Sequence, residues 1–530
     1  MIRRSFSLIA AAAIAMISVS APTKADIYGL MVGIDQYEAE QNLQGAVADA
    51  KDIADALEFQ GAREVVVLLN EKATYDRVAA TLASLIDKAR PGDTLVFSYS
   101  GHGTQMDNVE GDDNEKDGRD ELWVLGGFNQ RDGRGEFILD DGLHDWLRQA
   151  AAKKLNVILV SDSCHSGTLT RSIDKRACPL PSRLSKSTPT RLMIRRRRPK
   201  PVNRTTVDAS IPNLLYIGAA PDDEKVQEVW IGTQARGALS FSVAQAIRGL
   251  ADNNGDNALD GHEIQKFVRN QVAQLMDYRQ LPQISVGEGF TMALDKAGRR
   301  EGNRSLELGE LGLRVVNGEL SDDERRRIVG VKHGSNQCGL TWDRKAGHLV
   351  TQAGDVTSYN VTSVDALQAL ILKHRLVGAL KLAMSERALT SKINPGFCLF
   401  KDKDRFQLYF EGAEHSYWTI FGVDAQGRIM HYFPLEEYNE KAFREPGKAK
   451  GDILIEAAAP FGGEYIVALV TDRPVDEFLA TLAAYNEKII DEAFVGEVKR
   501  VLGRAEHQIA IQSYYSAKSV LQAGEVKCGL

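Results

Sequence analysis

The feature that most constrains the fold is a regular alternation of apolar runs and amphipathic segments between Asp26 and Cys164. The apolar runs are "IYGLMVGID", "REVVVLLN", "DTLVFSYSGHG" and "LNVILVSDSC", and the segments between them repeat apolar residues at helical spacing. Strands that are apolar along their whole length are typical of a parallel sheet with helices on both faces. The sequence therefore predicts a doubly wound, mostly parallel α/β sheet, which resumes between Leu214 and Leu294.

Two of these predicted strands end in side chains that can perform chemistry. The stretch "YSGHG" carries His102, and "DSCHSG" carries Cys164. Because reactive groups of open α/β sheets lie beyond the carboxyl ends of the strands, the two side chains are expected to meet. An imidazole can hold a thiol as the nucleophilic thiolate and later protonate a leaving amine. The neighbouring glycines allow the amides of Gly103 and Cys164 to point at an oxyanion.

Each residue alone could have a structural role instead, as a buried cysteine or as a histidine that is hydrogen-bonded within the core. Two strand-end motifs in one sheet favour the catalytic interpretation instead. The paired motifs "VFSYSGHG" and "VSDSCHSG" resemble those of the caspase-like cysteine peptidases of family C14, specifically the bacterial metacaspase, or orthocaspase, type. The resemblance covers about residues 26–294, including "RGALSFSVAQAI". It implies a caspase-like fold and a cysteine endopeptidase without an organic cofactor, with Cys164 as nucleophile and His102 as general acid and base.

The same resemblance implies cleavage of protein or peptide substrates after Arg or Lys. Asp162 stands two residues before Cys164, and by resemblance Asp49 and Ser100 complete an acidic pocket for the basic side chain. A buried carboxylate can form a bidentate pair with a guanidinium, which favours Arg over Lys. For Asp162 alone, the alternative is a turn aspartate that caps backbone amides.

A basic insertion interrupts the α/β pattern. Residues 171–204 carry many Arg and Lys side chains, including "RRRR", against the single acid Asp174. By resemblance this segment is part of a linker at about residues 171–210 that caspase relatives cut in themselves, so we predict self-cleavage there. A solvated loop, or a segment that binds an anionic surface, is the alternative.

Two acidic segments suggest calcium. The first, "DNVEGDDNEKDGRDE", lies between His102 and Trp123, and a high density of like charge favours a bound cation or full solvation. By resemblance to calcium-dependent metacaspases, the residues near such a site are Asp120, Asp140 and Asp141. Arg171 stands where that family has an aspartate ligand.

The second acidic segment, "DNNGDNALDGHE", fits the spacing of an EF-hand loop. Asn257 stands where glycine is expected, and asparagine tolerates a left-handed backbone better than most residues. The alternative is a turn that caps a helix, because EF-hand loops normally occur in pairs. The predicted ligands are Asp252, Asn254, Asp256, Ala258, Asp260 and Glu263.

Residues 1–25 have the order of a secretory signal peptide, with two arginines, an apolar run and small residues. We therefore expect an exported protein, periplasmic or secreted, without a stable membrane span once this segment is removed. Five cysteines are few and odd in number, so at least one thiol lacks a partner within the chain. The net charge of -7 argues against nucleic acid as the main partner.

The sequence pattern changes after the predicted peptidase domain at residues 26–295, from alternating strands and helices to short strands separated by turn residues. We expect a linker region at 296–340 and a mainly β domain at 341–530, with helices at 364–383 and 475–501. The last domain resembles an uncharacterised β-rich domain appended to bacterial caspase-like proteins, and binding of a cell-envelope component or partner protein is expected of it. A catalytically silent scaffold and a calcium-responsive binding module remain alternative functions for the chain.

Overall fold

The structure is a computed structural model of the 530-residue chain. It describes residues 25–107, 119–129, 135–163, 211–219, 226, 228–231, 234–252, 254–276, 280–295, 308–334, 339–351, 356–383, 389–394, 399–434 and 451–518. Residues 1–24 of the predicted signal peptide, the basic insertion and Cys164 lie outside these residues.

A six-stranded sheet forms the centre of the N-terminal region. Its order is β12 (Gln283–Val286), β8 (Leu214–Gly218), β7 (Asn156–Asp162), β3 (Thr94–Ser100), β1 (Ile27–Gly33) and β2 (Glu64–Leu69). All neighbours are parallel except β12, which runs antiparallel to β8. The predicted mostly parallel α/β sheet is confirmed, and β12 is an edge strand that the sequence pattern did not indicate.

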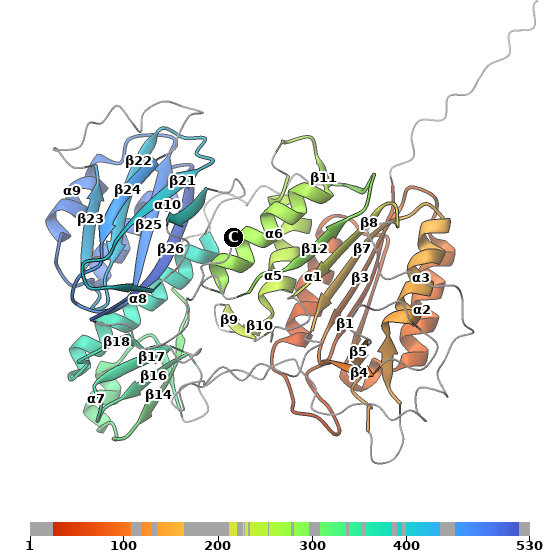
Figure 1. The fold of residues 1–530 in the computed structure, drawn as a ribbon, viewed down its shortest axis with the longest axis horizontal. Coiled ribbons are helices and arrows are strands. Elements are labelled where there is room, and N and C mark those ends of the chain that lie inside the picture. Colours follow the sequence, from red (N-terminus) through yellow and green to blue (C-terminus); the bar gives the residue numbers. More distant parts are fainter. Residues whose placement is uncertain are drawn as a thin grey trace, which may run out of the picture.

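Helices cover both faces of this sheet (Figure 1). One face packs against α1 (Ala46–Phe59), α5 (Ala238–Gln245) with its π-helical extension at 246–250, and α6 (Gly261–Leu275). The other face packs against α2 (Tyr75–Lys88) and α3 (Asp140–Ala152). Alternate residues of one strand serve the two cores, because Met31 joins the first and Leu30 the second.

Three small sheets surround the central one. The first contains β4 (Gly103–Asp107), β5 (Arg119–Val124) and β6 (Phe137–Leu139). The second pairs β9 (Val229–Ile231) with β10 (Gln234–Arg236). The third pairs β11 (Ala258–Asp260) with β13 (Thr291–Ala293). Two residues separate the end of β3 from the start of the β4–β5–β6 sheet. This small sheet therefore lies next to the carboxyl edge of the central sheet.

The C-terminal region is built on a ten-stranded, mainly antiparallel sheet. The strands of its main path are β15 (Val331–His333), β14 (Leu311–Val316), β16 (Leu340–Asp343), β17 (His348–Thr351), β18 (Val356–Ser358), β25 (Gly462–Thr471), β22 (Tyr417–Val423) and β23 (Ile429–Phe433). β26 (His507–Ala517) pairs with β25 and with β20 (Leu399–Lys401). Because β14 and β15 belong to this sheet, ordered structure of the β-rich region includes part of the segment expected as a linker.

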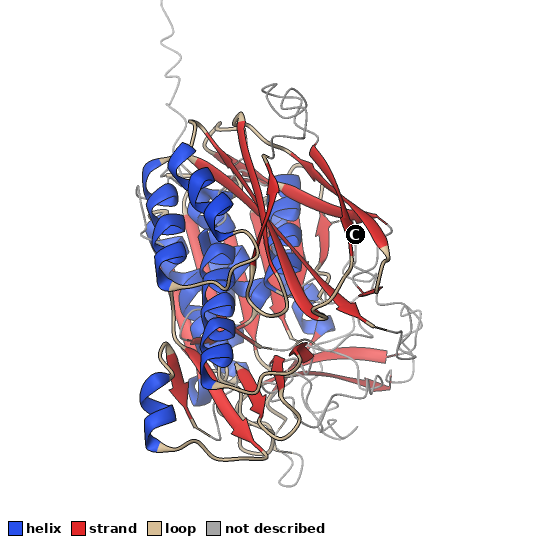
Figure 2. Ribbon diagram, turned by 90° about the vertical axis from the view of Figure 1, so that its left-hand side faces the viewer, coloured by secondary structure: helices blue, strands red, loops and turns tan. Residues whose placement is uncertain are grey.

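Two layers pack on this second sheet. On one face lie α8 (Val364–Ala383), α9 (Asp476–Tyr485) and α10 (Glu492–Arg504), which gather on one side of the strands in Figure 2. On the other face lies a three-stranded sheet of β19 (Thr390–Asn394), β21 (Arg405–Glu411) and β24 (Gly451–Glu456). A short helix, α7 (Asp322–Arg327), follows β14.

The single helix expected at 475–501 is wrong, because the structure divides it into α9 and α10. Asn486, with a ψ of 126°, leaves helical geometry and bridges to Ile429 of β23, and Glu487 follows with a left-handed φ of 63°. The Asp491 side chain then accepts the backbone N–H of Phe494 and caps the second helix. Pairing with a neighbouring strand therefore overrides a locally helical pattern.

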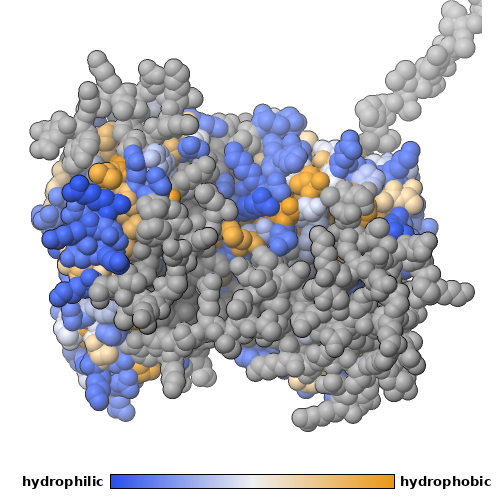
Figure 3. Space-filling model, in the orientation of Figure 1, coloured by the Kyte–Doolittle hydropathy of each residue, from blue (hydrophilic) through white to orange (hydrophobic). Residues whose placement is uncertain are grey.

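The described surface carries few large exposed hydrophobic side chains, which are Val329, Tyr417, Leu454 and Ile489. They lie far apart in sequence, and apolar colour occurs as small separate patches on the face in Figure 3. Within the described part of the chain, no helix has the length and apolar character that a membrane crossing requires.

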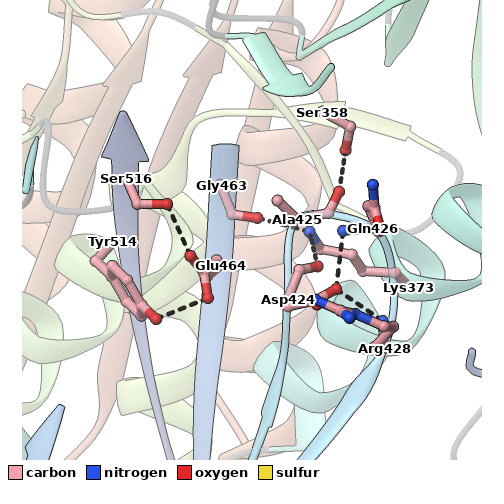
Figure 4. A network of polar contacts seen from close by, with 10 residues as sticks. All are labelled: Ser358, Lys373, Asp424, Ala425, Gln426, Arg428, Gly463, Glu464, Tyr514 and Ser516. Carbon is pink, nitrogen blue, oxygen red and sulfur yellow. Dashed lines mark hydrogen bonds and ion pairs between the residues drawn. The ribbon is translucent and has the colours of Figure 1, made fainter. Parts of the chain in front are cut away.

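A buried polar network connects α8 to the ten-stranded sheet of the C-terminal region (Figure 4). Lys373 is fully buried, and its Nζ donates to the carbonyl oxygens of Asp424 at 2.8 Å and Gly463 at 2.6 Å. The Glu464 carboxylate accepts hydroxyl hydrogen bonds from Tyr514 at 2.7 Å and Ser516 at 2.8 Å. Burial raises the pKa of Glu464 to about 7 and lowers the pKa of Lys373 to about 8.

These two pKa values predict a minimum in the stability of the ten-stranded sheet near neutral pH. Glu464 ionises near pH 4.5 when unfolded but near pH 7 when folded, so its contribution is fully present below pH 4.5 and is lost as pH rises through 7. Lys373 has a lowered pKa, so its contribution is present above pH 10.5 and is lost as pH falls through 8.

We expect the free energy of local unfolding to fall by up to about 3 kcal/mol between acid and neutral pH. Hydrogen exchange of peptides from β25 and β26, corrected for the intrinsic exchange rate, measures this fall. Glu464→Gln should remove it, whereas Glu456→Gln on the edge strand β24 should leave it unchanged. A pH dependence that persists in Glu464→Gln would mean that another group titrates.

Candidate active site

His102 lies two residues beyond β3, at the carboxyl edge of the central sheet. Its side chain is buried, and its Nε2 lies 2.6 Å from the carbonyl oxygen of Gln41. A carbonyl oxygen only accepts hydrogen bonds, so Nε2 carries a proton and Nδ1 is the basic nitrogen of the neutral ring. The Tyr37 ring packs against the imidazole with centroids 4.6 Å apart, and the His102 backbone N–H donates to the Tyr37 hydroxyl at 2.7 Å.

Glycine is required between β3 and His102. A Cβ atom at Gly101 would lie 2.6 Å from the hydroxyl oxygens of both Tyr37 and Tyr99. The Tyr99 hydroxyl in turn lies 2.6 Å from the carbonyl oxygen of His102, and the Tyr99 ring stacks on Trp123. The backbone on both sides of the imidazole is therefore fixed by aromatic side chains from β3, β5 and the loop after β1.

Three residues of the predicted acidic pocket converge at this edge. Ser100 is the last residue of β3 and pairs in register with Asp162, the last residue of β7. The Ser100 hydroxyl donates to the Asp49 carboxylate at 2.7 Å, and Asp49 comes from the first turn of α1. Asp49, Ser100 and Asp162 are all 0% exposed. The fold thus brings together two carboxylates and a hydroxyl that are far apart in sequence.

The nucleophile and the oxyanion donors are described only in part. Cys164 lies outside the described residues; it follows Asp162 by two positions, as His102 follows Ser100. Ser163, the last described residue before it, is buried, and its hydroxyl lies 3.1 Å from that of Ser161. Gly103 begins β4 and pairs with Trp123. Both predicted catalytic residues therefore follow neighbouring parallel strands.

The first predicted calcium ligands lie at one end of the β5–β6 hairpin. Leu122 pairs with Leu139 in an antiparallel ladder, so the backbone of Asp120 runs back toward the start of α3, where Asp140 and Asp141 lie. Among the residues that the structure describes, no three His, Cys, Asp or Glu side chains converge in a way that would hold a metal ion. The acidic loop at 108–118 lies outside the described residues.

The second predicted calcium loop has several backbone features of an EF-hand. Asn257 adopts a left-handed φ of 60°, as expected for the position that glycine usually occupies. Leu259 is buried in the core beside α6, and β11, which contains it, pairs with β13. The Asp252 and Asp256 carboxylates accept backbone N–H groups of the loop itself, at 2.7 and 2.8 Å for the shortest bonds. The oxygens needed for a cation are thus present but cap the loop.

Sequence patterns did not identify the residues that hold the acidic pair in position. The Gly237 N–H donates to Asp49 at 2.8 Å, and Ser240 donates to Asp162 through its N–H at 3.0 Å and its hydroxyl at 2.7 Å. Both residues belong to the start of α5, within the quoted stretch "RGALSFSVAQAI". Small residues at a helix start gave no chemical signal by themselves, so only the fold reveals their contact with the carboxylates.

The comparisons with known proteins agree with the paired motifs. Residues 28–172 match the family model described as the metacaspase, peptidase C14 domain. Metacaspase-1 of Pyricularia oryzae is 34% identical over 148 residues, which cover 26% of this chain and 36% of that protein. Metacaspase-2 of Trypanosoma brucei brucei is 33% identical over 153 residues, which cover 27% of this chain and 42% of that protein. The chain thus spans about two fifths or less of these relatives.

Solved structures include two partial likenesses. A protein of Geobacter sulfurreducens is 23% identical, with a TM-score of 0.35, and covers 51% of this chain and 95% of its own. Caspase-1 from Spodoptera frugiperda is 12% identical, with a TM-score of 0.31, and covers 55% and 100% respectively. The motifs and the family match together show that residues 28–172 are similar to the metacaspase domain of peptidase family C14, a family of cysteine peptidases.

Proposed function

We propose that this protein is a cysteine endopeptidase that cleaves peptide bonds after Arg or Lys, with Cys164 as nucleophile and His102 as general acid and base. One observation carries the proposal: two buried carboxylates lie where β3 and β7 end, Asp162 as the last residue of β7 and Asp49 on α1 in contact with Ser100, the last residue of β3. A buried carboxylate attracts a guanidinium or an ammonium strongly and can hold a guanidinium in a bidentate pair, so these carboxylates suit a basic side chain of a substrate. An aspartate substrate would instead meet repulsion.

In the proposed reaction the Cys164 thiolate attacks the carbonyl carbon of the scissile bond, and the amide group of Gly103 or Cys164 stabilises the oxyanion. The C–N bond then breaks as imidazolium His102 gives its Nδ1 proton to the leaving amine. Water attacks the resulting thioester and gives a proton to His102, and the sulfur leaves as thiolate. The hydrogen bond from Nε2 to the Gln41 carbonyl supports this role, since it orients the ring throughout the cycle.

The direct test is hydrolysis of fluorogenic peptides that end in Arg, Lys or Asp by the full-length protein. We expect turnover after Arg and Lys and none after Asp, because only a cation complements the two carboxylates. Turnover after Asp alone would contradict the acidic pocket. If no peptide is cleaved under any condition, the silent scaffold is the better description of the chain.

Self-cleavage within residues 171–204 is a second expected outcome, since this segment is rich in the residue types that the pocket is proposed to accept. Intact-mass analysis of the purified protein should give two fragments whose junction follows an Arg or Lys of this segment. The Cys164→Ala variant should stay whole and should be cut when active protein is added. Wild-type protein that hydrolyses peptides while its chain remains intact would overturn the self-cleavage proposal.

Calcium is the cation proposed for the loop from Asp252 to Glu263. The left-handed Asn257 and the buried Leu259 fit such a loop, and the bound ion would supply positive charge to its carboxylates. Calorimetric titration of Cys164→Ala with Ca²⁺ should show binding that Glu263→Gln loses and that the exposed-site control Glu58→Gln keeps. Binding lost only in Asp120→Asn or Asp140→Asn would assign the ion to the other acidic segment.

We also propose that the protein acts outside the cytoplasm and that its β-rich region binds an envelope component or partner protein. The order of residues 1–25 supports export, and the extended sheet with its separate helical layer supports an independent binding role. Fractionation of cells, followed by mass spectrometry of the mature N-terminus, tests the export. A chain found only in the cytoplasm with residues 1–25 retained would contradict it.

A further inference from the structure

The start of α5 holds both carboxylates of the acidic pocket. Gly237, which precedes the helix, donates its backbone N–H to Asp49 Oδ1, and Ser240 donates both its N–H and its hydroxyl to Asp162 Oδ2. Asp49, Asp162 and Ser240 are each 0% exposed. These donors lie beyond residues 28–172, the segment that matches the metacaspase family model. A later part of the chain therefore completes the site.

Three further contacts hold the described residues of this later segment, 228–231 and 234–240, against the N-terminal half of α1 and the two residues before it. The buried Glu228 carboxylate accepts the N–H groups of Gln44 at 3.0 Å and Gly45 at 2.8 Å. Arg236 forms an ion pair with Asp52, one turn along α1 from Asp49. A Cβ atom at Gly45 would lie 2.8 Å from the backbone of Arg236, so the two segments are in close backbone contact. The segment that carries the donors to the acidic pair is thus packed directly against α1 and the residues before it.

A fixed carboxylate distinguishes between basic side chains. A guanidinium binds best when it meets carboxylate oxygens in a defined plane, whereas an ammonium is a point charge with rotatable donors. Because both Ser240 bonds end on Oδ2, rotation of the Asp162 carboxyl group would break them. The Ser240 hydroxyl therefore restricts the orientation in which Asp162 presents itself.

We propose that Ser240 is a positioning residue that makes the acidic pocket prefer Arg over Lys by fixing the orientation of the Asp162 carboxylate. This inference rests on the proposed function and adds to it the residue that sets the specificity. Ser240 itself does not need to touch the substrate, because it acts through Asp162.

The test compares Arg and Lys peptides in full-length Ser240→Ala protein. This variant keeps the backbone N–H bond to Asp162 and loses only the hydroxyl bond. We expect kcat/KM for the Arg peptide to fall about tenfold, mainly through KM, and that for the Lys peptide to change about twofold or less. Ser240→Thr, which keeps a hydroxyl, should restore the Arg preference.

Ser242→Ala is the matched control. Ser242 is also buried on α5, but its hydroxyl donates to the Ala238 carbonyl oxygen at 2.7 Å within the helix. It should leave the ratio of Arg to Lys cleavage unchanged, and thermal melting should verify that both variants fold. An unchanged ratio in Ser240→Ala, or an equal fall in Ser242→Ala, would overturn the inference.

Binding separates this inference from the proposed catalysis. In a Cys164→Ala background, the affinity ratio for peptides containing Arg or Lys can be measured without turnover. If wild-type protein does not hydrolyse the peptides but Ser240→Ala still lowers the Arg to Lys affinity ratio, the proposed catalysis fails and the positioning role stands. If neither peptide binds, the positioning role fails together with the acidic pocket.

Discussion

Replacement of Cys164 by alanine is expected to lower the rate of peptide hydrolysis by at least about 10⁴-fold, the scale on which nucleophile removal acts in other peptidases. Cys164 follows the last residue of β7 by two positions in the sequence, and alanine has no group that can form the thioester. Steady-state hydrolysis of the preferred Arg or Lys peptide measures the loss. Cys338→Ala removes a cysteine far away in sequence and should retain full activity.

His102→Ala should produce a loss of similar size, because nucleophile and base act as one unit and their single losses do not add. The double variant Cys164→Ala/His102→Ala should therefore be no slower than either single variant by more than a few-fold, about the error of such rates. Activity that survives Cys164→Ala would show that hydrolysis comes from another group or from a contaminant. Activity lost in Cys338→Ala as well would point to a structural cause.

The centre of this sheet could be predicted because β1, β3 and β7 are buried along their whole length and are therefore largely apolar. Continuous runs such as "TLVFSYS" have no other common explanation once helical segments separate them. The same logic located the site edge, since the carboxyl ends of all strands in a parallel sheet lie at one edge. Ser100 and Asp162 are register partners because β3 and β7 are also adjacent in this sheet, which the strand pattern alone does not determine.

The structure adds contacts that no local pattern encodes. Gly237 and Ser240 donate hydrogen bonds to aspartates that are far away in sequence. The sequence around them indicates only the start of a helix. The short strands β4, β9 and β12 were not predicted, because three to five residues give too little periodicity to be recognised. Lys373 lies within an apolar helix pattern, and its buried ammonium donates to the carbonyl oxygens of Asp424 and Gly463, which are far away in sequence.

Removal of one pocket charge should have the second large effect. Asp162→Asn keeps the shape of the side chain and an oxygen that can accept the Ser240 hydroxyl, so the fold should survive. It leaves a substrate guanidinium with one fewer buried counter-charge, a loss of about 3 to 5 kcal/mol, or roughly 10² to 4 × 10³ in kcat/KM for Arg peptides. Asp49→Asn should act in the same direction, because the Ser100 hydroxyl connects the two sides of the pocket.

Asp93→Asn is the control that separates a loss of substrate recognition from a general loss of stability. Asp93 is buried at the opposite edge of the same sheet, where it accepts the backbone N–H groups of Asp26 at 2.9 Å and Arg90 at 2.7 Å. Its replacement is expected to lower stability without selective loss of Arg cleavage. If Asp93→Asn and Asp162→Asn reduce kcat/KM equally, the effect of the Asp162 substitution is structural. The acidic pocket then does not recognise the basic side chain of the substrate. A loss confined to Asp162→Asn and Asp49→Asn would assign recognition of the basic side chain to the carboxyl edge of the sheet.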